Sequence, residues 1–329
     1  MANLTKFGND LYTGARSFNF VAKRRIWYAI ALVLMAVSVV IPFLTGGFNF
    51  GIEFRGGSQF QVTDVSDTAQ QPAIDAVQSV VPGEVAHVTA VGLTGLRVQT
   101  DELTDDETNN VALALADAYG VPENDVTASF IGPSWGADIT AQALRGLVVF
   151  VVLAVVMMAI YFRTWKMAIA ALASLIHDLV ITAGVYAATG FEVTPAAIIG
   201  FLTILGFSLY DTVVVFDKIR ENTAELGNES RLTFAESVNL AVNQTLVRSI
   251  NTGVVAALPV ASILFIGSFV LGADTLRDIS LALLVGILVG TYSTVFIGAP
   301  LYAQLRDTEE EIKKQTKRAI ALRTLNVAE

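Results

Sequence analysis

Residues 194–217 read TPAAIIGFLTILGFSLYDTVVVFD, and this apolar run is long enough to cross a bilayer as a helix, which takes about 20 residues. Asp211 nevertheless lies inside it. An ionised Asp at the centre of a spanning helix costs about 2.5 to 3.5 kcal/mol, so this carboxylate needs a partner, a proton or a water-filled cavity. We therefore interpret Asp211 as functional; the alternatives are a carboxylate at the water boundary or one that only fixes helix packing. Asp217, beside Lys218, is more typical of an interfacial residue.

The composition indicates an integral membrane protein. Of the 329 residues, 53% are hydrophobic and 16% are charged, whereas soluble domains average about 25% charged. The absence of cysteine excludes disulfide bonds, thiolate metal sites and a cysteine nucleophile, and two histidines leave little material for a metal site. The net charge of -9 argues against a nucleic-acid partner.

Hydropathy predicts six membrane-spanning helices, at 26–45, 144–162, 167–189, 195–216, 249–269 and 279–303. Most of the 21 lysines and arginines then fall on one side of the membrane, and the exceptions are Arg55, Arg97, Arg145 and Arg277. By the positive-inside rule, both termini are cytoplasmic in this multi-pass protein of the cytoplasmic (inner or plasma) membrane. The first span is longer than the apolar core of a signal peptide, so we expect a retained anchor.

These spans divide the chain into five parts. We expect an N-terminal cytoplasmic tail at 1–25, a first transmembrane helix at 26–45, an extracytoplasmic domain at 46–142, transmembrane helices 2–6 within 143–304 and a C-terminal cytoplasmic tail at 305–329. The loop after the fourth span is charged and is predicted to be partly helical at 233–242.

The segment 46–142 is polar, and its pattern predicts an α+β domain. Strands are expected at 48–65, 85–92, 96–100 and 125–131, and helices at 68–81 and 104–119. The order β-α-β-β-α-β predicts a ferredoxin-like fold, inserted between the first two spans of the helical bundle.

Residues 51–57, GIEFRGG, stand where the first span leads into this domain. Gly51, Gly56 and Gly57, around the carboxylate of Glu53, favour a bulge or tight bend in which backbone approaches backbone. A phosphate-binding loop is the weaker alternative, because the pattern G-x-x-x-x-G-K-[ST] is missing.

Other polar residues fall in or beside the predicted spans. His177 and Asp178 lie in the third span, either as a proton-carrying pair or as a polar pair that locks helix packing. Arg248 begins the fifth span near the predicted depth of Asp211. We predict an ion pair between them, which protonation of the carboxylate would break; the alternative is an arginine that snorkels to the interface.

Gly286 and Gly290 form a small-xxx-small face in the last span. This pattern lets two membrane helices approach closely, so we predict a packing role for both glycines.

Several motifs together resemble one family. They are LYDTVVVFDKIREN at 209–222, GIEFRGG at 51–57, HD at 177–178, NQTLVR at 243–248 and GTYS at 290–293. Over essentially the whole chain, the sequence is similar to the SecF family of bacterial protein-export membrane proteins. Glu53 departs from the Asp usual in the family but keeps the carboxylate.

The resemblance implies half of a transporter of the RND superfamily, with SecD as partner, beside the SecYEG channel, YajC, the translocating preprotein and membrane lipid. It implies a role in protein export driven by the proton-motive force, with the proton gradient in place of a cofactor and no bound metal. By position, Asp211 and Arg248 match the family residues implicated in proton conduction, and SecD holds the family's other intramembrane Asp.

Two other functions stay open at this point. An RND-type proton-coupled efflux subunit for small molecules would need a duplicate or a partner, since such proteins usually have twelve spans. A scaffold, in which the buried charges only set helix register, would not transport at all. An enzyme is not indicated, because no nucleotide-binding loop, H-E-x-x-H motif or nucleophile constellation occurs.

Overall fold

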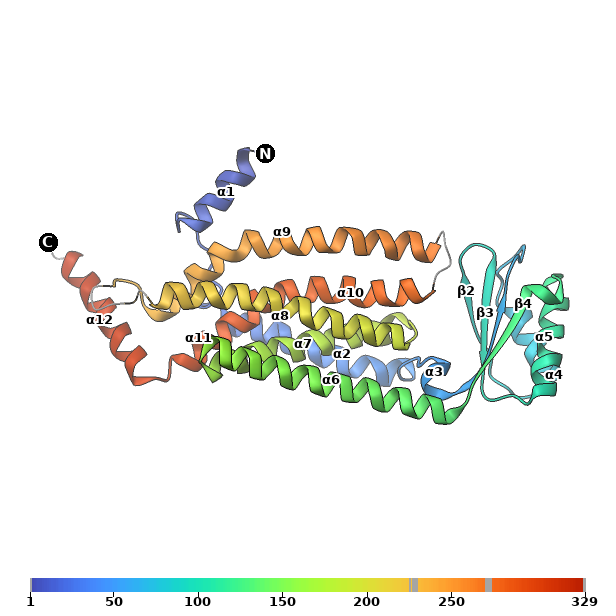
Figure 1. The fold of residues 1–329 in the computed structure, drawn as a ribbon. Coiled ribbons are helices and arrows are strands. Elements are labelled where there is room, and N and C mark those ends of the chain that lie inside the picture. Colours follow the sequence, from blue (N-terminus) through green and yellow to red (C-terminus); the bar gives the residue numbers. More distant parts are fainter. Residues whose placement is uncertain (1, 225, 227–229, 270–273, 328–329) are drawn as a thin grey trace.

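The chain forms a bundle of long helices with a small sheet domain at one end, and both termini lie at the opposite end (Figure 1). The computed structural model describes residues 2–224, 226, 230–269 and 274–327. The described residues include six helices long and apolar enough to cross a membrane, which confirms the predicted number of spans.

The bundle contains α2 (Arg24–Thr45), α6 (Pro133–Phe162), α7 (Trp165–Thr189), α8 (Pro195–Ala224), α9 (Phe234–Phe269) and α10 (Asp274–Ser293). The last of these continues through a π-helical turn, η2 (Thr294–Gly298), into α11 (Ala299–Arg306). Two further helices that the sequence did not predict are α1 (Ala2–Tyr12) and α12 (Glu310–Val327). The helix predicted at 233–242 and the fifth span form one continuous helix, α9.

The ends of the helices follow from local chemistry. Gly46 and Gly190 adopt left-handed conformations after α2 and α7, where a side chain would be strained. Proline stands at the first position of α6 and of α8, where its missing N–H has no helical acceptor to lose.

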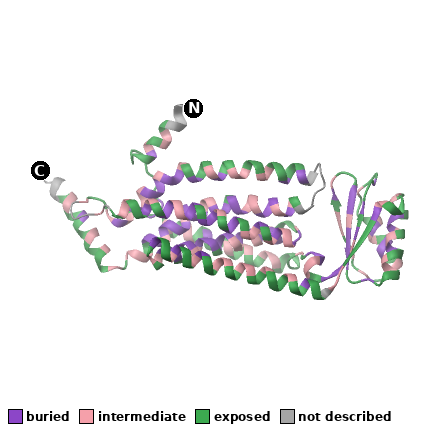
Figure 2. Ribbon diagram, in the orientation of Figure 1, coloured by how far each residue is buried: buried purple, intermediate pink, exposed green. Residues whose placement is uncertain are grey.

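The interior of the bundle is formed by α7, α8 and α10, whereas α6 and α9 lie on the outside (Figure 2). The outer helices expose large apolar side chains, including Leu32 on α2, Leu153 on α6 and Val255 on α9. Such faces are the surfaces that a membrane helix presents to lipid or to a partner helix.

The sheet domain has the predicted ferredoxin-like topology. Its elements are β1 (Gly57–Val62), α4 (Gln71–Val80), β2 (His87–Val91), β3 (Gly95–Thr100), α5 (Asp105–Tyr119), η1 (Glu123–Asp125) and β4 (Val126–Ile131). The strands are antiparallel and lie in the order β2-β3-β1-β4. The first strand, β1, therefore pairs directly with the last strand, β4, although residues 63–125 lie between them in the sequence. The fully buried side chains of Phe60 and Val98 in the sheet share one core with Val77 of α4 and with Val111 and Leu115 of α5.

The first predicted strand, 48–65, is wrong in its N-terminal half. Only Gly57–Val62 is a strand; Ile52–Arg55 forms a helical turn, α3, and Phe50 makes an isolated bridge to Val193. The cause is the glycine motif, because Gly56 and Gly57 have φ values of 80° and 135°, which interrupt extended backbone. Helix α6 begins at Pro133, within the range 46–142 expected for the outer domain.

Candidate functional site within the helix bundle

Asp211 lies on the face of α8 that is turned into the bundle. Its side chain is only 4% exposed, and Ser208 and Thr212 on the same face of the helix are buried too. The Ser249 hydroxyl of α9 donates a hydrogen bond of 2.8 Å to Asp211 Oδ1. No donor among the described residues reaches Oδ2, although this oxygen is buried. Ser249 thus holds Oδ1, whereas Oδ2 has no hydrogen-bond partner in the described part of the chain.

The predicted ion pair between Asp211 and Arg248 is wrong for this structure. Two successive residues of α8 instead contact two successive residues of α9, because Asp211 accepts from Ser249 inside the bundle while Tyr210 faces Arg248 outside it. Arg248 Nη2 donates to the Tyr210 hydroxyl over 3.5 Å, and both side chains are exposed. The orientation of α9 turns the guanidinium outward, which sequence spacing alone does not reveal.

His177 and Asp178 are both buried and link three helices. His177 Nδ1 lies 3.2 Å from Asp178 Oδ1, and His177 Nε2 lies 2.6 Å from the Tyr292 hydroxyl of α10. Ser208 of α8 donates a hydrogen bond of 2.6 Å to Asp178 Oδ2. Tyr292, His177, Asp178 and Ser208 therefore form a continuous chain of polar contacts across α10, α7 and α8.

A second polar contact joins α8 to the π-helical turn. The hydroxyls of Thr212 and Thr294 are 3.0 Å apart and buried. Turns of π-helix inside α-helices occur frequently at functional sites, because they realign side chains within a continuous helix. Sequence reasoning missed Ser208, Thr212 and Ser249. For Ser208 and Thr212, their spacing on α8 relative to Asp211 was the available signal.

Gly286 and Gly290 lie where α10 packs on α8. A Cβ atom at Gly286 would be 2.1 Å from Ile204 Cγ1, and one at Gly290 would be 3.1 Å from Ser208 Cβ and 3.5 Å from Asp178 Oδ2. The absence of side chains at these two positions lets α10 approach the polar residues of α7 and α8.

Asp217 does not join this cluster. Its side chain is exposed, further along α8 than Asp211. The structure brings together His177, Asp178 and Asp211 with their partners, and leaves Arg248 and Asp217 on the outer surface.

Comparison with known proteins decides the family. The model described as "Protein export membrane protein SecD/SecF, C-terminal" matches residues 113–308, and "SecD/SecF GG Motif" matches residues 43–63. The protein translocase subunit SecF of Streptomyces coelicolor is 43% identical over all of this chain and 87% of its own length. The chain belongs to the SecD/SecF family of protein-export membrane proteins. The SecF subunit of Pseudomonas aeruginosa is also similar, at 32% identity over 90% of this chain and 94% of its own.

Solved structures of SecDF share the fold. The crystal structure of SecDF from Thermus thermophilus matches with a TM-score of 0.79 and 31% identity over 89% of this chain, and this chain spans 39% of its length. SecDF in a super-membrane-facing form matches with a TM-score of 0.65 and 29% identity over 92% of this chain and 40% of that one. The chain is a multi-pass membrane protein with the SecF part of this architecture.

The GG motif of the SecD/SecF family forms a tight junction between the helix bundle and the sheet domain. A Cβ atom at Gly51 would lie 2.2 Å from Glu53 Oε2 and 3.1 Å from Glu192 Oε1, and one at Gly57 would lie 2.3 Å from the Thr100 carbonyl oxygen. Two carboxylates and a backbone carbonyl are therefore packed against glycine Cα atoms. This is a structural junction of closely approaching backbone.

A charged cluster at this junction escaped sequence analysis. Glu192, in the connection between α7 and α8, is only 5% exposed and accepts from Arg97 over 3.0 Å and from Gln99 over 2.7 Å, both on β3. Asp278 of α10, equally buried, accepts from Thr194 over 3.0 Å and lies 3.5 Å from Arg277. Arg97 and Arg277 are two of the four basic residues that the predicted topology places on the side opposite the termini. Their rarity on that side was the feature of the sequence that could have pointed to acidic partners.

We expect Arg97→Gln to loosen the outer domain from the bundle. The substitution removes the cation from a buried ion pair and leaves Glu192 with Gln99 as its remaining donor on β3. Loss of one partner of a buried pair costs roughly 3 kcal/mol. Amide hydrogen exchange in β3 should become faster while β2 and α5 change less. Arg55→Gln, at an exposed arginine on the same side, is the matched control, and equal protection in both variants would contradict the role of Arg97.

We also expect Glu53→Gln to stabilise the junction at neutral pH. Burial, with a smaller contribution from the charge of Glu192, raises the pKa of Glu53 above its ordinary value of 4.5. The folded state therefore binds the proton more tightly than the unfolded state, and stability falls as pH rises through the interval between the two pKa values. At pH 7, the Glu53→Gln variant should therefore unfold at a higher temperature than the wild type. This difference should disappear at pH values below the pKa that Glu53 has in the unfolded chain.

Glu107→Gln is the matched control for this pH dependence. Glu107 accepts from the Thr104 backbone and hydroxyl in the capping box of α5, which lowers the pKa of Glu107. The ionised Glu107 carboxylate therefore stabilises the folded state at neutral pH, and this stabilisation is lost as the pH falls through the lowered pKa of Glu107. The two glutamine variants should therefore shift the unfolding temperature at pH 7 in opposite directions; shifts of the same sign would refute the assignment for Glu53.

The described residues contain no group of three or more His, Cys, Asp or Glu side chains arranged to hold a metal ion. The polar groups that lie together in the bundle are the Asp211 carboxylate and the chain of Tyr292, His177, Asp178 and Ser208. Carboxylate and imidazole groups are the side chains that can take up and release protons inside a membrane protein.

Proposed function

We propose that the chain works with a SecD partner to use the proton-motive force for protein export across the cytoplasmic membrane. The membership in the family and the full-length similarity to SecF subunits support the role in export. The proposal includes no catalytic activity and no cofactor; the energy source is the proton gradient.

The observation that carries the coupling role is the state of Asp211. It is buried in a membrane-spanning helix, with Oδ1 bound to Ser249 and Oδ2 without a donor among the described residues. A buried carboxylate with one unsatisfied oxygen favours uptake of a proton, which would neutralise it.

Protonation would act on the contact between α8 and α9. The ionised carboxylate only accepts hydrogen bonds, whereas the neutral acid also carries an O–H donor. A proton on Oδ2 would leave Oδ1 able to accept from Ser249, but it would give the buried carboxyl group an O–H that needs an acceptor. Reaching that acceptor would change the packing of α8 against α9, beside the contact between Tyr210 and Arg248. We infer that this pair of contacts is the element that senses the proton.

The outward face of Tyr210 and Arg248 fits a helix of SecD. Tyr210 is 54% exposed and the guanidinium of Arg248 points the same way, yet both lie on membrane-spanning helices. A charged group is costly in lipid and is normally covered by protein or water. An acidic or polar side chain on the partner would complete a relay of which this chain holds one half.

The proposed topology has both termini in the cytoplasm and residues 46–142 outside it, in keeping with the excess of Lys and Arg near the termini. The wider assembly that we propose includes SecYEG, YajC and the translocating preprotein.

A vesicle assay tests the function as a whole. Inverted membrane vesicles that contain the channel and SecD are compared with and without this chain, with and without an imposed proton gradient. We expect stimulation of preprotein export only when both the chain and the gradient are present. Equal export in all four conditions would overturn the proposal, and gradient-driven movement of a small molecule by the chain alone would favour an efflux subunit.

A further inference from the structure

A basic cavity of about 1040 Å³ opens at the end of the bundle where both termini lie, which the proposed topology makes the cytoplasmic end. Its walls come from the segment before α2 and the start of α2, the connection before α9 and the beginning of α9, the connection after α11, and α12. The charged residues in its lining are Arg24, Arg25, Arg231, Arg323, Glu236 and Asp307.

Two of the four arginines are neutralised and two are not. Arg24 Nη1 lies 2.8 Å from Asp307 Oδ2, and Arg323 binds both carboxylate oxygens of Glu236. Arg25 and Arg231 form no ion pair with any residue that the structure describes, and both are exposed. Among the described residues that line it, the basic cavity therefore keeps an excess of two positive charges.

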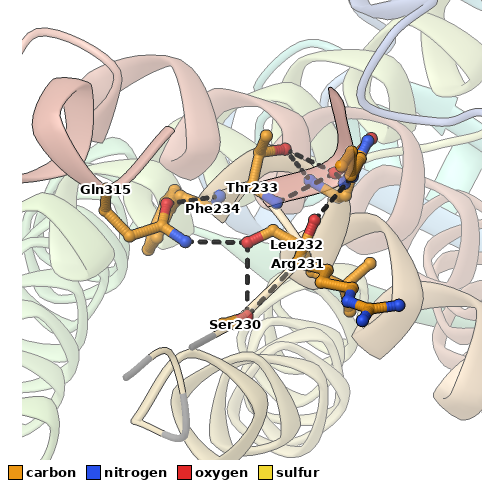
Figure 3. Close-up of polar contacts among 8 residues, drawn as sticks. Ser230, Arg231, Leu232, Thr233, Phe234 and Gln315 are labelled. Atoms are coloured by element: carbon orange, nitrogen blue, oxygen red, sulfur yellow. Dashed lines mark hydrogen bonds and ion pairs between the residues drawn. The ribbon is translucent and has the colours of Figure 1, made fainter. Parts of the chain in front are cut away.

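The walls of the basic cavity are held in place by side-chain amides. Asn239 of α9 donates to Ser17 Oγ and to the Phe18 carbonyl oxygen, and accepts from the Val21 N–H. On the opposite side, Gln315 of α12 donates to the Leu232 carbonyl oxygen and accepts from the Phe234 N–H (Figure 3).

The guanidinium of Arg323 reaches the same wall and donates to the Arg231 carbonyl oxygen over 2.6 Å. The backbone from the Arg231 carbonyl group to the Phe234 N–H is thus held by α12. The Arg231 side chain extends from the start of this held stretch.

An apolar groove of about 450 Å³ lies next to the basic cavity, and Asn19 lines both. The groove runs between α2, α9 and the end of α10. Its lining includes Phe20, Trp27, Ile250 and Phe296. Ser249 and Tyr292, the partners of Asp211 and His177, line it as well.

We propose that the basic cavity and the apolar groove together bind one anionic phospholipid. The phosphate would lie between Arg25 and Arg231, and an acyl chain would occupy the groove beside Ile250. Guanidinium groups bind phosphate oxygens in bidentate geometry, and basic pockets between helices at the cytoplasmic boundary suit anionic headgroups. A free phosphate would need the basic cavity alone, so the adjoining groove favours a lipid.

Binding to the purified full chain in neutral detergent tests this site. Native mass spectrometry would compare phosphatidylglycerol, phosphatidylcholine and water-soluble glycerol phosphate. We expect phosphatidylglycerol to bind at least about tenfold more tightly than phosphatidylcholine, because two arginines without an acidic partner among the described residues favour a headgroup with a net negative charge. It should also bind more tightly than glycerol phosphate, which has no acyl chain for the groove. Equal binding of phosphatidylcholine, or equally tight binding of glycerol phosphate, would overturn the proposal.

Variants separate the two halves of the site. Arg25→Gln with Arg231→Gln should weaken phosphatidylglycerol binding by about tenfold or more. Lys314→Gln with Lys317→Gln removes the same charge from exposed positions of α12 outside the cavity and should leave binding within about twofold. Ile250→Gln should weaken binding of the lipid but not of glycerol phosphate.

Unchanged lipid binding in the arginine double variant would refute the site. Circular dichroism establishes that each variant is folded, and the single variant Arg231→Gln, at an exposed side chain, provides the same comparison if the double variant is unstable. The measurement is independent of export, so its failure leaves the proposed function untouched.

Discussion

Asp211→Asn is expected to abolish the response of export to the proton gradient. The amide keeps the size of the side chain and can still accept from Ser249, but it cannot take up and release a proton. We expect gradient-dependent stimulation to fall by about tenfold or more, as is typical when a proton-transferring group is lost. Export in the absence of a gradient should be unchanged. The measurement is preprotein translocation into inverted vesicles with SecD and the channel present.

Glu221→Gln is the matched control for this variant. It makes the same change from carboxylate to amide on α8, at a side chain that is 61% exposed and pairs only with Lys218 among the described residues. We expect full gradient-dependent stimulation. Co-purification with SecD distinguishes loss of coupling from loss of assembly. Full stimulation by Asp211→Asn would assign the carboxylate to helix packing and favour a scaffold.

Gly286→Ala is expected to destabilise the bundle. The new Cβ would lie 2.1 to 2.8 Å from three atoms of Ile204, a buried and β-branched side chain with little freedom to rotate. Overpacking of this kind costs about 1 to 3 kcal/mol, so the unfolding temperature in detergent should fall. Because α10 also carries Gly290 and Tyr292, we expect the contact between Tyr292 and His177 to be disturbed as well.

A double variant distinguishes overpacking from other effects. Ile204→Ala removes the atoms that clash and alone should cost about 2 to 5 kcal/mol as a cavity. Combined with Gly286→Ala, the loss should be smaller than the sum of the two single losses. Gly206→Ala on α8 is the control, because nothing lies within 4 Å of its added Cβ, and its stability should be equal or slightly higher. Additive losses would contradict direct contact.

The two predictions concern neighbouring parts of the site on which the proposed function depends. Asp211 provides the titratable group, and the close approach of α10 to α8 holds Asp178 and Ser208 in contact beside it. Proton uptake at Asp211 would be felt first by Ser249 of α9, a residue that also lines the apolar groove. A bound lipid would therefore contact the same helix face that responds to the proton.

Much of the fold could be predicted from the sequence. Hydropathy identified the six spanning helices, because burial in lipid demands long apolar segments. Alternation and turn residues predicted the β-α-β-β-α-β order of the outer domain. The buried position of Asp211 was also predictable, since a carboxylate within an apolar helix is costly and points to a special environment.

The sequence by itself determined which segments enter the membrane, the fold of the outer domain and the presence of a carboxylate inside a spanning helix, because each depends on the local order of apolar and polar residues. Only the tertiary structure decided that Ser249 and not Arg248 binds Asp211, and that Glu192 pairs with Arg97. Those partners come from segments far apart in the chain. Their contact depends on how each helix is rotated about its axis and on where the glycine motif turns the backbone, and neither is encoded in local periodicity.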